Sequence, residues 1–292
     1  MSANILEEEI IFEGDTFTVV TGGSTRDHDA PRLLWSTGIG MSANGACTME
    51  LLEQLAGELP SHRLMVVDNL PKNPDARLRK LNDVAAMRHA LLETILPKTE
   101  TDSVQTVIGG LSLGGLVSAQ LLRLYSKNPE LDPQEISFAH LAVTPDSSGF
   151  MGLTSRFAIM QLGMHMRLDR RNRPMLNSAL TEAAFRIRRE RRYLKLLGGQ
   201  AVEACRQRLE DVDFSDYAGR IGFAVAEIDR LTDTERHRRI ADLYRGEFDE
   251  LPGGHEFSFK PEDVARCLIS QMERSSRRRN SSESSESYPQ TV

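Results

Sequence analysis

A serine with glycines on both sides stands in the run Gly110-Leu111-Ser112-Leu113-Gly114. An apolar segment of strand length precedes it, and a helical pattern follows it. This is the G-x-S-x-G pattern, in which a serine occupies a tight turn between a strand and a helix. Such a turn holds the hydroxyl out for attack on a carbonyl carbon, and the helix start offers N–H groups, that of Leu113 included, to an oxyanion. We interpret Ser112 as a nucleophile; the alternative is a helix cap.

A serine hydroxyl needs an imidazole to accept its proton and a carboxylate to orient that imidazole. In a strand–turn–helix setting these partners follow along the chain, the acid first and the histidine last. Of seven histidines, His255 follows the last long predicted strand and lies in the glycine-containing loop LPGGHEF. For the acid we prefer Asp229, which directly follows an apolar run, to its neighbours Asp233 and Glu227. The alternative for His255 is an ordinary surface-loop histidine.

The remaining pattern indicates how these residues are positioned. Strands are predicted at 8–14, 16–23, 31–38, 63–69, 104–110, 135–146, 220–229 and 248–251. Helices are predicted at 49–59, at 75–96, after the serine, and at 261–274. Strands that alternate with helices predict an α/β fold, in which a mostly parallel central sheet has helices on both faces. The first two strands can form an antiparallel edge.

Composition is that of an ordinary globular protein of 292 residues, with 40% hydrophobic and 27% charged residues. The net charge of −6 argues against a nucleic-acid partner. The three cysteines have no metal-ligand or disulfide-framework spacing. Because there is neither a signal-peptide pattern nor an apolar run of about 20 residues, we expect a cytoplasmic protein without a transmembrane segment.

Residues 150–210 interrupt the alternation, because they contain helical patterns and no strand pattern. Residues 151–210 hold 13 Lys/Arg against 5 Asp/Glu, in a chain that is acidic overall. We expect a core domain of residues 1–149 and 211–275, a basic helical insertion at 150–210, and a disordered tail at 276–292. We interpret the basic residues of this insertion as a solvated face; the alternatives are a site for an anionic substrate and a peripheral membrane contact.

The chain resembles the α/β-hydrolase superfamily over residues 8–275, on the strand pair, GLSLGG, AEIDRLTD and GGHEF. The resemblance implies an α/β-hydrolase fold whose helical cap lies between strands six and seven. It also implies a Ser112–His255–Asp229 triad and an oxyanion hole formed by backbone N–H groups. The donors would be Leu113 and a residue of the loop Ser36-Thr37-Gly38-Ile39-Gly40. Thr37 stands where many members have histidine, and Ile39 is the implied donor, with Gly40 and Met41 as alternatives.

The first cap segment is rich in methionine and phenylalanine, which suit an irregular apolar ligand. Four of its residues are candidates for an acyl-binding wall, and their alternative is core packing: Met151, Phe157, Met160 and Met164.

The function expected is that of a serine esterase, which cleaves a small-molecule carboxylic ester through an acyl-enzyme and needs no metal or organic cofactor. One alternative is an acyltransferase that uses the same acyl-enzyme, and another is a non-catalytic binding protein. The sequence leaves the natural substrate and the oligomeric state open.

Overall fold

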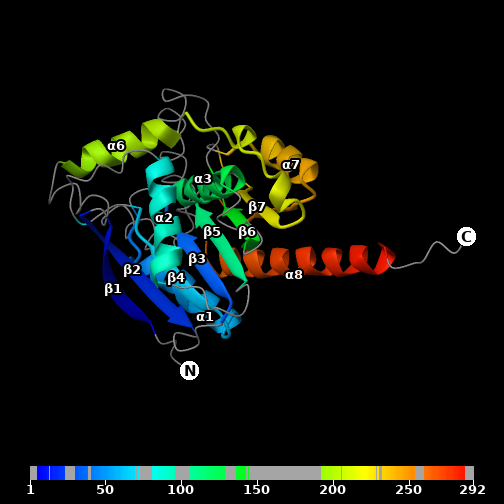
Figure 1. Ribbon diagram of the computed structural model, residues 1–292, viewed down its shortest axis with the longest axis horizontal. Helices are drawn as coiled ribbons and strands as arrows, with labels where there is room; N and C mark the ends of the chain where they lie inside the picture. Colours follow the sequence, from blue (N-terminus) through cyan, green and yellow to red (C-terminus); the bar gives the residue numbers. More distant parts are fainter. Residues whose placement is uncertain are drawn as a thin grey trace, which may run out of the picture.

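The structure is a computed structural model that describes residues 5–12, 14–23, 30–38, 41–69, 72, 81–95, 105–128, 136–142, 144, 192–204, 206–227, 229, 232–253 and 260–286. Within them lies an eight-stranded sheet in the order β1-β2-β4-β3-β5-β6-β7-β8 (Figure 1). The strands are β1 (Leu6–Phe12), β2 (Asp15–Gly23), β3 (Arg32–Ser36), β4 (Arg63–Val67), β5 (Thr106–Leu111), β6 (Ile136–Ala142), β7 (Ile221–Ala226) and β8 (Glu247–Leu251). Strands β4 to β8 and β3 pair in parallel, whereas β1 and β2 join antiparallel.

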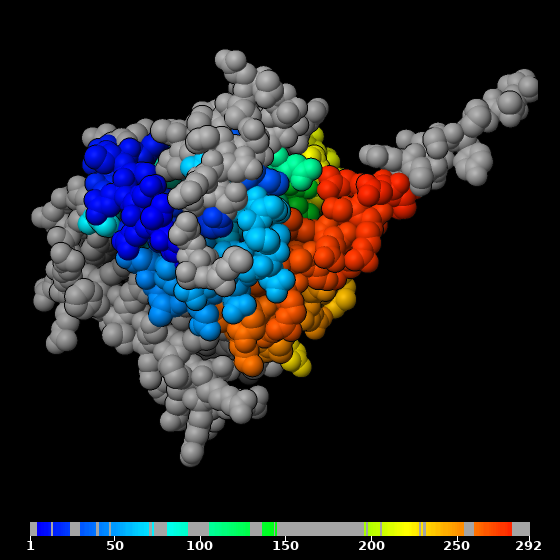
Figure 2. All heavy atoms as spheres, turned by 90° about the horizontal axis from the view of Figure 1, so that it is seen from below, coloured from blue at the N-terminus to red at the C-terminus, as the bar shows by residue number. Residues whose placement is uncertain are grey.

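Helices cover both faces of this sheet. They are α1 (Ala46–Glu58), α2 (Leu81–Ile95), α3 (Leu113–Lys127), α6 (Arg192–Ala204), α7 (Thr234–Leu243) and α8 (Pro261–Glu286), with 3-10 turns at Leu209–Asp211 and Ser215–Tyr217. α2, α3 and α7 pack on one face, and α1 lies beside α8 on the other (Figures 1 and 2). No helix in the described part of the chain is long and apolar enough to cross a membrane.

The central strands of the sheet are buried, whereas the edge strand β1 is exposed. Every residue of β3, β5 and β7 is buried, as expected for parallel strands that have helices on both sides. β1 is largely exposed at the edge of the sheet. Gly14 has a φ of 86° in the turn between β1 and β2, which is the left-handed region that glycine adopts readily. The predicted antiparallel edge is therefore confirmed.

The order of the strands places a topological switch point between the carboxyl ends of β3 and β5. These strands are neighbours, with Ser36 paired to Gly110. The chain leaves β3 toward α1 on one face and leaves β5 toward α3 on the other. In open parallel sheets, ligands bind in the crevice where successive connections diverge in this way. The serine predicted as nucleophile comes directly after β5.

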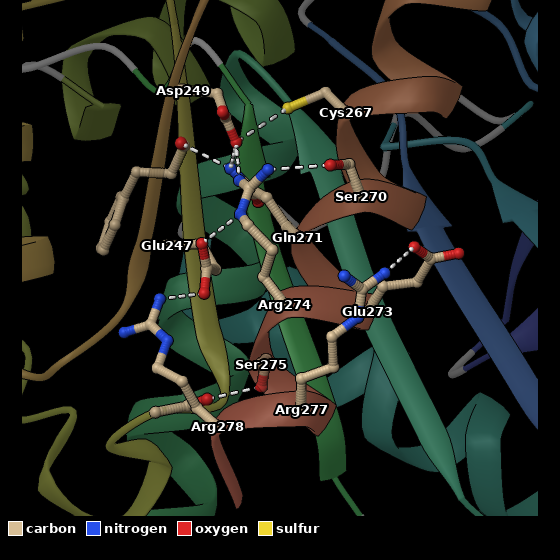
Figure 3. A network of polar contacts seen from close by, with 12 residues as sticks. Glu247, Asp249, Cys267, Ser270, Gln271, Glu273, Arg274, Ser275, Arg277 and Arg278 are labelled. Carbon is tan, nitrogen blue, oxygen red and sulfur yellow. Dashed lines mark hydrogen bonds and ion pairs between the residues drawn. The ribbon is translucent and has the colours of Figure 1, made fainter. Parts of the chain in front are cut away.

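The last helix is longer than the sequence indicated. α8 continues to Glu286, so the disordered tail expected from residue 276 is corrected for residues 276–286; residues 287–292 lie outside the described part. Two carboxylates on β8 bind the extended helix as far as Arg278. Arg274 bonds Glu247 at 2.6 Å and also reaches Asp249, and Arg278, one turn further on, bonds Glu247 too (Figure 3). Because the partners of these arginines are distant in sequence, composition alone did not reveal the helix.

A buried histidine joins α8 to the centre of the sheet. His140 of β6 has no exposed surface, and its Nδ1 lies 2.8 Å from Oε1 of Gln271. The Gln271 amide nitrogen donates to the Phe223 carbonyl oxygen at 2.9 Å and to Asp249 at 2.8 Å (Figure 3). Since Oε1 of Gln271 is then the acceptor, His140 Nδ1 carries the proton. Burial lowers the pKa of His140 to about 4, although Gln271 and Asp249 act in the opposite sense.

Candidate active site

Ser112 lies in the turn between β5 and α3, with φ 56° and ψ −118°. A positive φ is uncommon outside glycine, and among the described non-glycine residues only Arg245 shares it. Surrounding hydrogen bonds hold this conformation. The Ser112 N–H donates to the Ala142 carbonyl oxygen at 2.8 Å, and the Ser112 carbonyl oxygen accepts from Gly115 N–H at 2.9 Å. The serine thus occupies the strand-to-helix turn that its sequence pattern predicts.

The glycines around this turn leave no room for a side chain. A Cβ on Gly110 would lie 2.2 Å from the Gly114 carbonyl carbon. One on Gly114 would lie 2.1 Å from the Ser36 carbonyl oxygen, and one on Gly115 would lie 2.1 Å from Thr144 Oγ1. The glycines therefore let α3 approach both its own strand and the loop after β3. This close approach brings the candidate nucleophile beside the candidate oxyanion loop.

The two expected oxyanion donors are described to different extents. Leu113 is buried and is the first residue of α3, where N–H groups have no acceptor within the helix. Ile39 and Gly40 lie outside the described residues. Met41, the third alternative, donates its N–H to the Gly38 carbonyl oxygen at 3.3 Å. The N–H of Met41 therefore already has an acceptor within the loop.

The three candidate acids have different surroundings. Asp229 is half-buried, and its carboxylate accepts a 2.6 Å hydrogen bond from Thr232 Oγ1. Asp233 is the N-cap of α7, where its carboxylate accepts from Arg236 N–H at 3.1 Å. Glu227 is exposed. A helix cap therefore accounts for Asp233, whereas Asp229 follows the end of β7.

His255, the expected base, lies outside the described residues. The strand that leads to it, β8, ends at Leu251, which pairs with Ala226 at the end of β7. The N–H of Glu227 donates to the Leu251 carbonyl oxygen at 2.9 Å. The chain segments toward Asp229 and His255 therefore leave the sheet side by side, at the edge where β5 also ends.

Of the expected cap, the structure describes α6 and residues 206–210. α6 packs on the core near α2, with Leu196 and Gln200 buried. The four residues of the predicted acyl-binding wall lie outside the described residues: Met151, Phe157, Met160 and Met164. Most of the basic residues, those at 156–191, lie outside as well.

Sequence reasoning missed a buried polar group beside the Thr37 loop. Asp68 and Asn69 follow β4, and Arg88 projects from α2; their exposed fractions are 1%, 2% and 0%. Burial lowers the pKa of Arg88 to about 9, and the charge of Asp68 opposes that change. The available signal was a pair of polar residues directly after the apolar run of residues 64–67, since the carboxyl ends of parallel strands line ligand sites.

Known proteins share the fold of this chain. No protein-family model matches the chain, and no curated protein matches it either. Solved structures do match the chain. Its sheet order, serine turn and helix layers are those of the α/β-hydrolase fold, so the chain has this fold. This confirms the fold expected from the resemblance.

Three similar structures illustrate the likeness. The α/β hydrolase GrgF from Penicillium sp. sh18 is 17% identical, with a TM-score of 0.57 over 94% of this chain and 99% of that one. A serine hydrolase involved in carbazole degradation is 16% identical, with a TM-score of 0.60 over 92% and 99%. A thioesterase domain from the curacin biosynthetic pathway is 13% identical, with a TM-score of 0.57 over 92% and 99%. At these identities the likeness concerns the fold.

Proposed function

We propose that this protein is a serine hydrolase that cleaves a carboxylic ester through an acyl-enzyme. Ser112 Oγ attacks the ester carbonyl carbon while His255 accepts its proton, and Asp229 orients the imidazole. The N–H groups of Leu113 and Ile39 stabilise the oxyanion. His255 then protonates the leaving alkoxide, and a water molecule that it activates releases the acid. The chemistry uses only groups of the chain and water.

The observation that carries this proposal is the backbone of Ser112. Ser112 has a positive φ, lies at the carboxyl edge of the sheet and is surrounded by glycines that contact backbone atoms. This conformation is unfavourable in free energy, and a residue that only packs has no need of it. Strained backbone conformations that the surrounding structure holds in place cluster at active sites. A serine hydrolase and a thioesterase domain among the similar structures support acyl-group chemistry at this position.

The test is covalent labelling with a fluorophosphonate probe, which reacts with activated serines. We expect wild type to be labelled and Ser112→Ala to be unlabelled. Ser118→Ala is the matched control, because Ser118 is also buried on α3 but only donates to the Gly109 carbonyl oxygen at 3.0 Å. Labelling of all three proteins would show that the probe reacts with a residue other than Ser112 and Ser118. A folded wild type that resists labelling would overturn the proposal and favour a binding protein.

Hydrolysis of p-nitrophenyl esters defines the substrate class in the same proteins. Acyl chains of increasing length measure the depth of the site, and a neutral and an anionic ester of equal length measure its charge preference. If the cap binds an anionic substrate, salt raises KM for the anionic ester alone. Product analysis in the presence of alcohols and thiols distinguishes hydrolysis from acyl transfer.

A further inference from the structure

Asn69 connects three separate parts of the molecule through three of its polar atoms. Its Oδ1 accepts from Arg88 of α2 at 2.5 Å, and its Nδ2 donates to the Thr37 carbonyl oxygen. Its backbone carbonyl oxygen accepts from Nε2 of Gln200, on α6, at 2.9 Å. Asn69 and Gln200 are both buried, with 2% and 0% of their surfaces exposed. The loop after β3, the core helix and the cap helix therefore meet at one asparagine.

Arg88 fixes the position of this asparagine. Its guanidinium is fully buried and donates to two carbonyl oxygens at the end of β4, those of Val67 at 3.0 Å and Asp68 at 2.7 Å, as well as to the Asn69 side chain. Buried arginine needs such partners, because desolvation disfavours its charge. Since Asn69 Oδ1 is held by Arg88, the amide must point its nitrogen toward Thr37.

Asp68 anchors the other end of the same loop. Its Oδ1 accepts from the Ala43 N–H at 2.5 Å, and its Oδ2 lies 3.5 Å from Ser42 Oγ. Thr37 and Ala43 bracket the segment that includes Ile39, the expected oxyanion donor. Two consecutive side chains after β4 thus hold the segment at both ends.

The held carbonyl lies directly against the first turn of α3. A Cβ on Gly114 would be 2.6 Å from the Thr37 carbonyl oxygen, so that oxygen cannot move toward α3 without a clash. Asn69 closes the other side by its hydrogen bond. The orientation of the Thr37–Gly38 peptide, and hence the entry to the oxyanion segment, depends on this amide.

We infer that Asn69 is a positioning residue that couples the docking of cap helix α6, through Gln200, to the geometry of the oxyanion loop. The inference rests on the proposed function and deepens it: the cap, besides covering the substrate, contributes to stabilisation of the transition state. A 1 Å displacement of such a donor is sufficient for a loss of about 100-fold in rate.

Asn69→Asp is the sharpest variant, because it keeps the shape and the acceptor for Arg88 but removes the donor to Thr37. We expect kcat to fall about 10- to 100-fold with KM within about twofold. A boronic acid matched to the acyl chain, which forms a tetrahedral adduct with the serine, should lose affinity by the same factor. Asn69→Asp with unchanged kcat and boronate affinity would overturn the inference, whatever happened to thermal stability.

Gln200→Leu tests the link from α6 to Asn69, and Gln120→Leu is its matched control, because it also removes a hydrogen bond between the core and the cap but one that does not involve Asn69. Gln120 is also buried and donates a comparable 2.9 Å hydrogen bond, to Gln207. We expect only Gln200→Leu to lower kcat and to accelerate amide hydrogen exchange in residues 37–45. If the two variants behaved alike, Gln200 would have only a packing role, and the coupling of α6 to the oxyanion loop would be excluded. If wild type neither reacts with the probe nor hydrolyses esters, the proposed function itself fails, which the wild-type control reveals separately.

Discussion

Ser112 and Ala142 are joined by a hydrogen bond of 2.8 Å from the serine N–H to the alanine carbonyl oxygen, so the end of β6 supports the turn at the end of β5. Thr144 follows on the same side and lies against α3, where a Cβ on Gly115 would meet its Oγ1. The conformation of the candidate nucleophile is therefore held by the neighbouring strand as well as by its own glycines.

Substitution of the turn glycines should separate two kinds of collision. Gly115→Ala meets the side chain of Thr144 and should lower the free energy of unfolding by about 1 to 3 kcal/mol. Thr144→Ala should restore most of that loss, because Oγ1 is buried with no hydrogen-bond partner among the described residues. Gly110→Ala meets backbone of Gly114, so Thr144→Ala should not rescue it. Urea unfolding of the single and double variants measures this; equal rescue of both would contradict it.

The two aspartates after β7 should differ strongly in their effect on hydrolysis. Asp229→Asn should lower kcat about 10³- to 10⁴-fold if Asp229 orients the catalytic histidine. Asp233→Asn should leave activity and stability close to wild type, because asparagine also caps a helix well. Steady-state kinetics on one ester decides between them, and a large loss in Asp233→Asn alone would exchange their roles.

Acid should destabilise the protein through His140. Its pKa is about 4 in the folded protein, against an ordinary value of 6.5 when unfolded, so the unfolded chain binds more protons between these values. Stability is then fully present above pH 6.5 and is lost as the pH falls toward 4. The stability lost at pH 4.5 is on the order of 2 to 3 kcal/mol. His140→Asn, which can still donate to Gln271, should flatten the decrease in unfolding free energy between pH 7 and 4.5. An unchanged slope would exclude His140 as its source.

Two neighbouring arginines of α8 should contribute unequally to stability. Arg274 forms an ion pair with Glu247, whose side chain is only 6% exposed, and Arg274→Ala should cost about 1 to 3 kcal/mol, because that buried carboxylate then keeps Arg278 but loses one of its two arginine partners (Figure 3). Arg277 is 77% exposed and pairs with the exposed Glu273, so Arg277→Ala should change stability by less than about 0.5 kcal/mol. Thermal unfolding of the two variants compares them directly, and similar melting temperatures would argue against docking of α8 by these ion pairs.

The sequence was informative where local pattern determines structure. Short apolar runs such as those of β5 and β7 predicted buried strands, and the glycines around Ser112 indicated a turn that no larger residue tolerates. Asp233 stood close enough to the strand end to compete with Asp229, and only the start of α7 accounts for it as a cap.

The sequence was uninformative where long-range contacts decide. Arg88 lies 19 residues from Asn69, and Gln200 lies 131 residues from it; each is an ordinary polar residue of a helix until the fold brings them together. The residues of α8 beyond Arg274 lack an apolar stripe, and the ion pair of Arg278 with Glu247 of β8 joins them to a strand distant in sequence. Neither arrangement leaves a periodic signal.

The exposed strand β1 also affects how copies of the protein meet. An edge strand presents unpaired N–H and C=O groups that invite another chain to extend the sheet. β1 carries the consecutive carboxylates Glu7, Glu8 and Glu9, and it also exposes 76% of Ile11. If two such edges were aligned, their carboxylates would lie against each other. This repulsion opposes edge-to-edge aggregation, which the exposed Ile11 alone would promote.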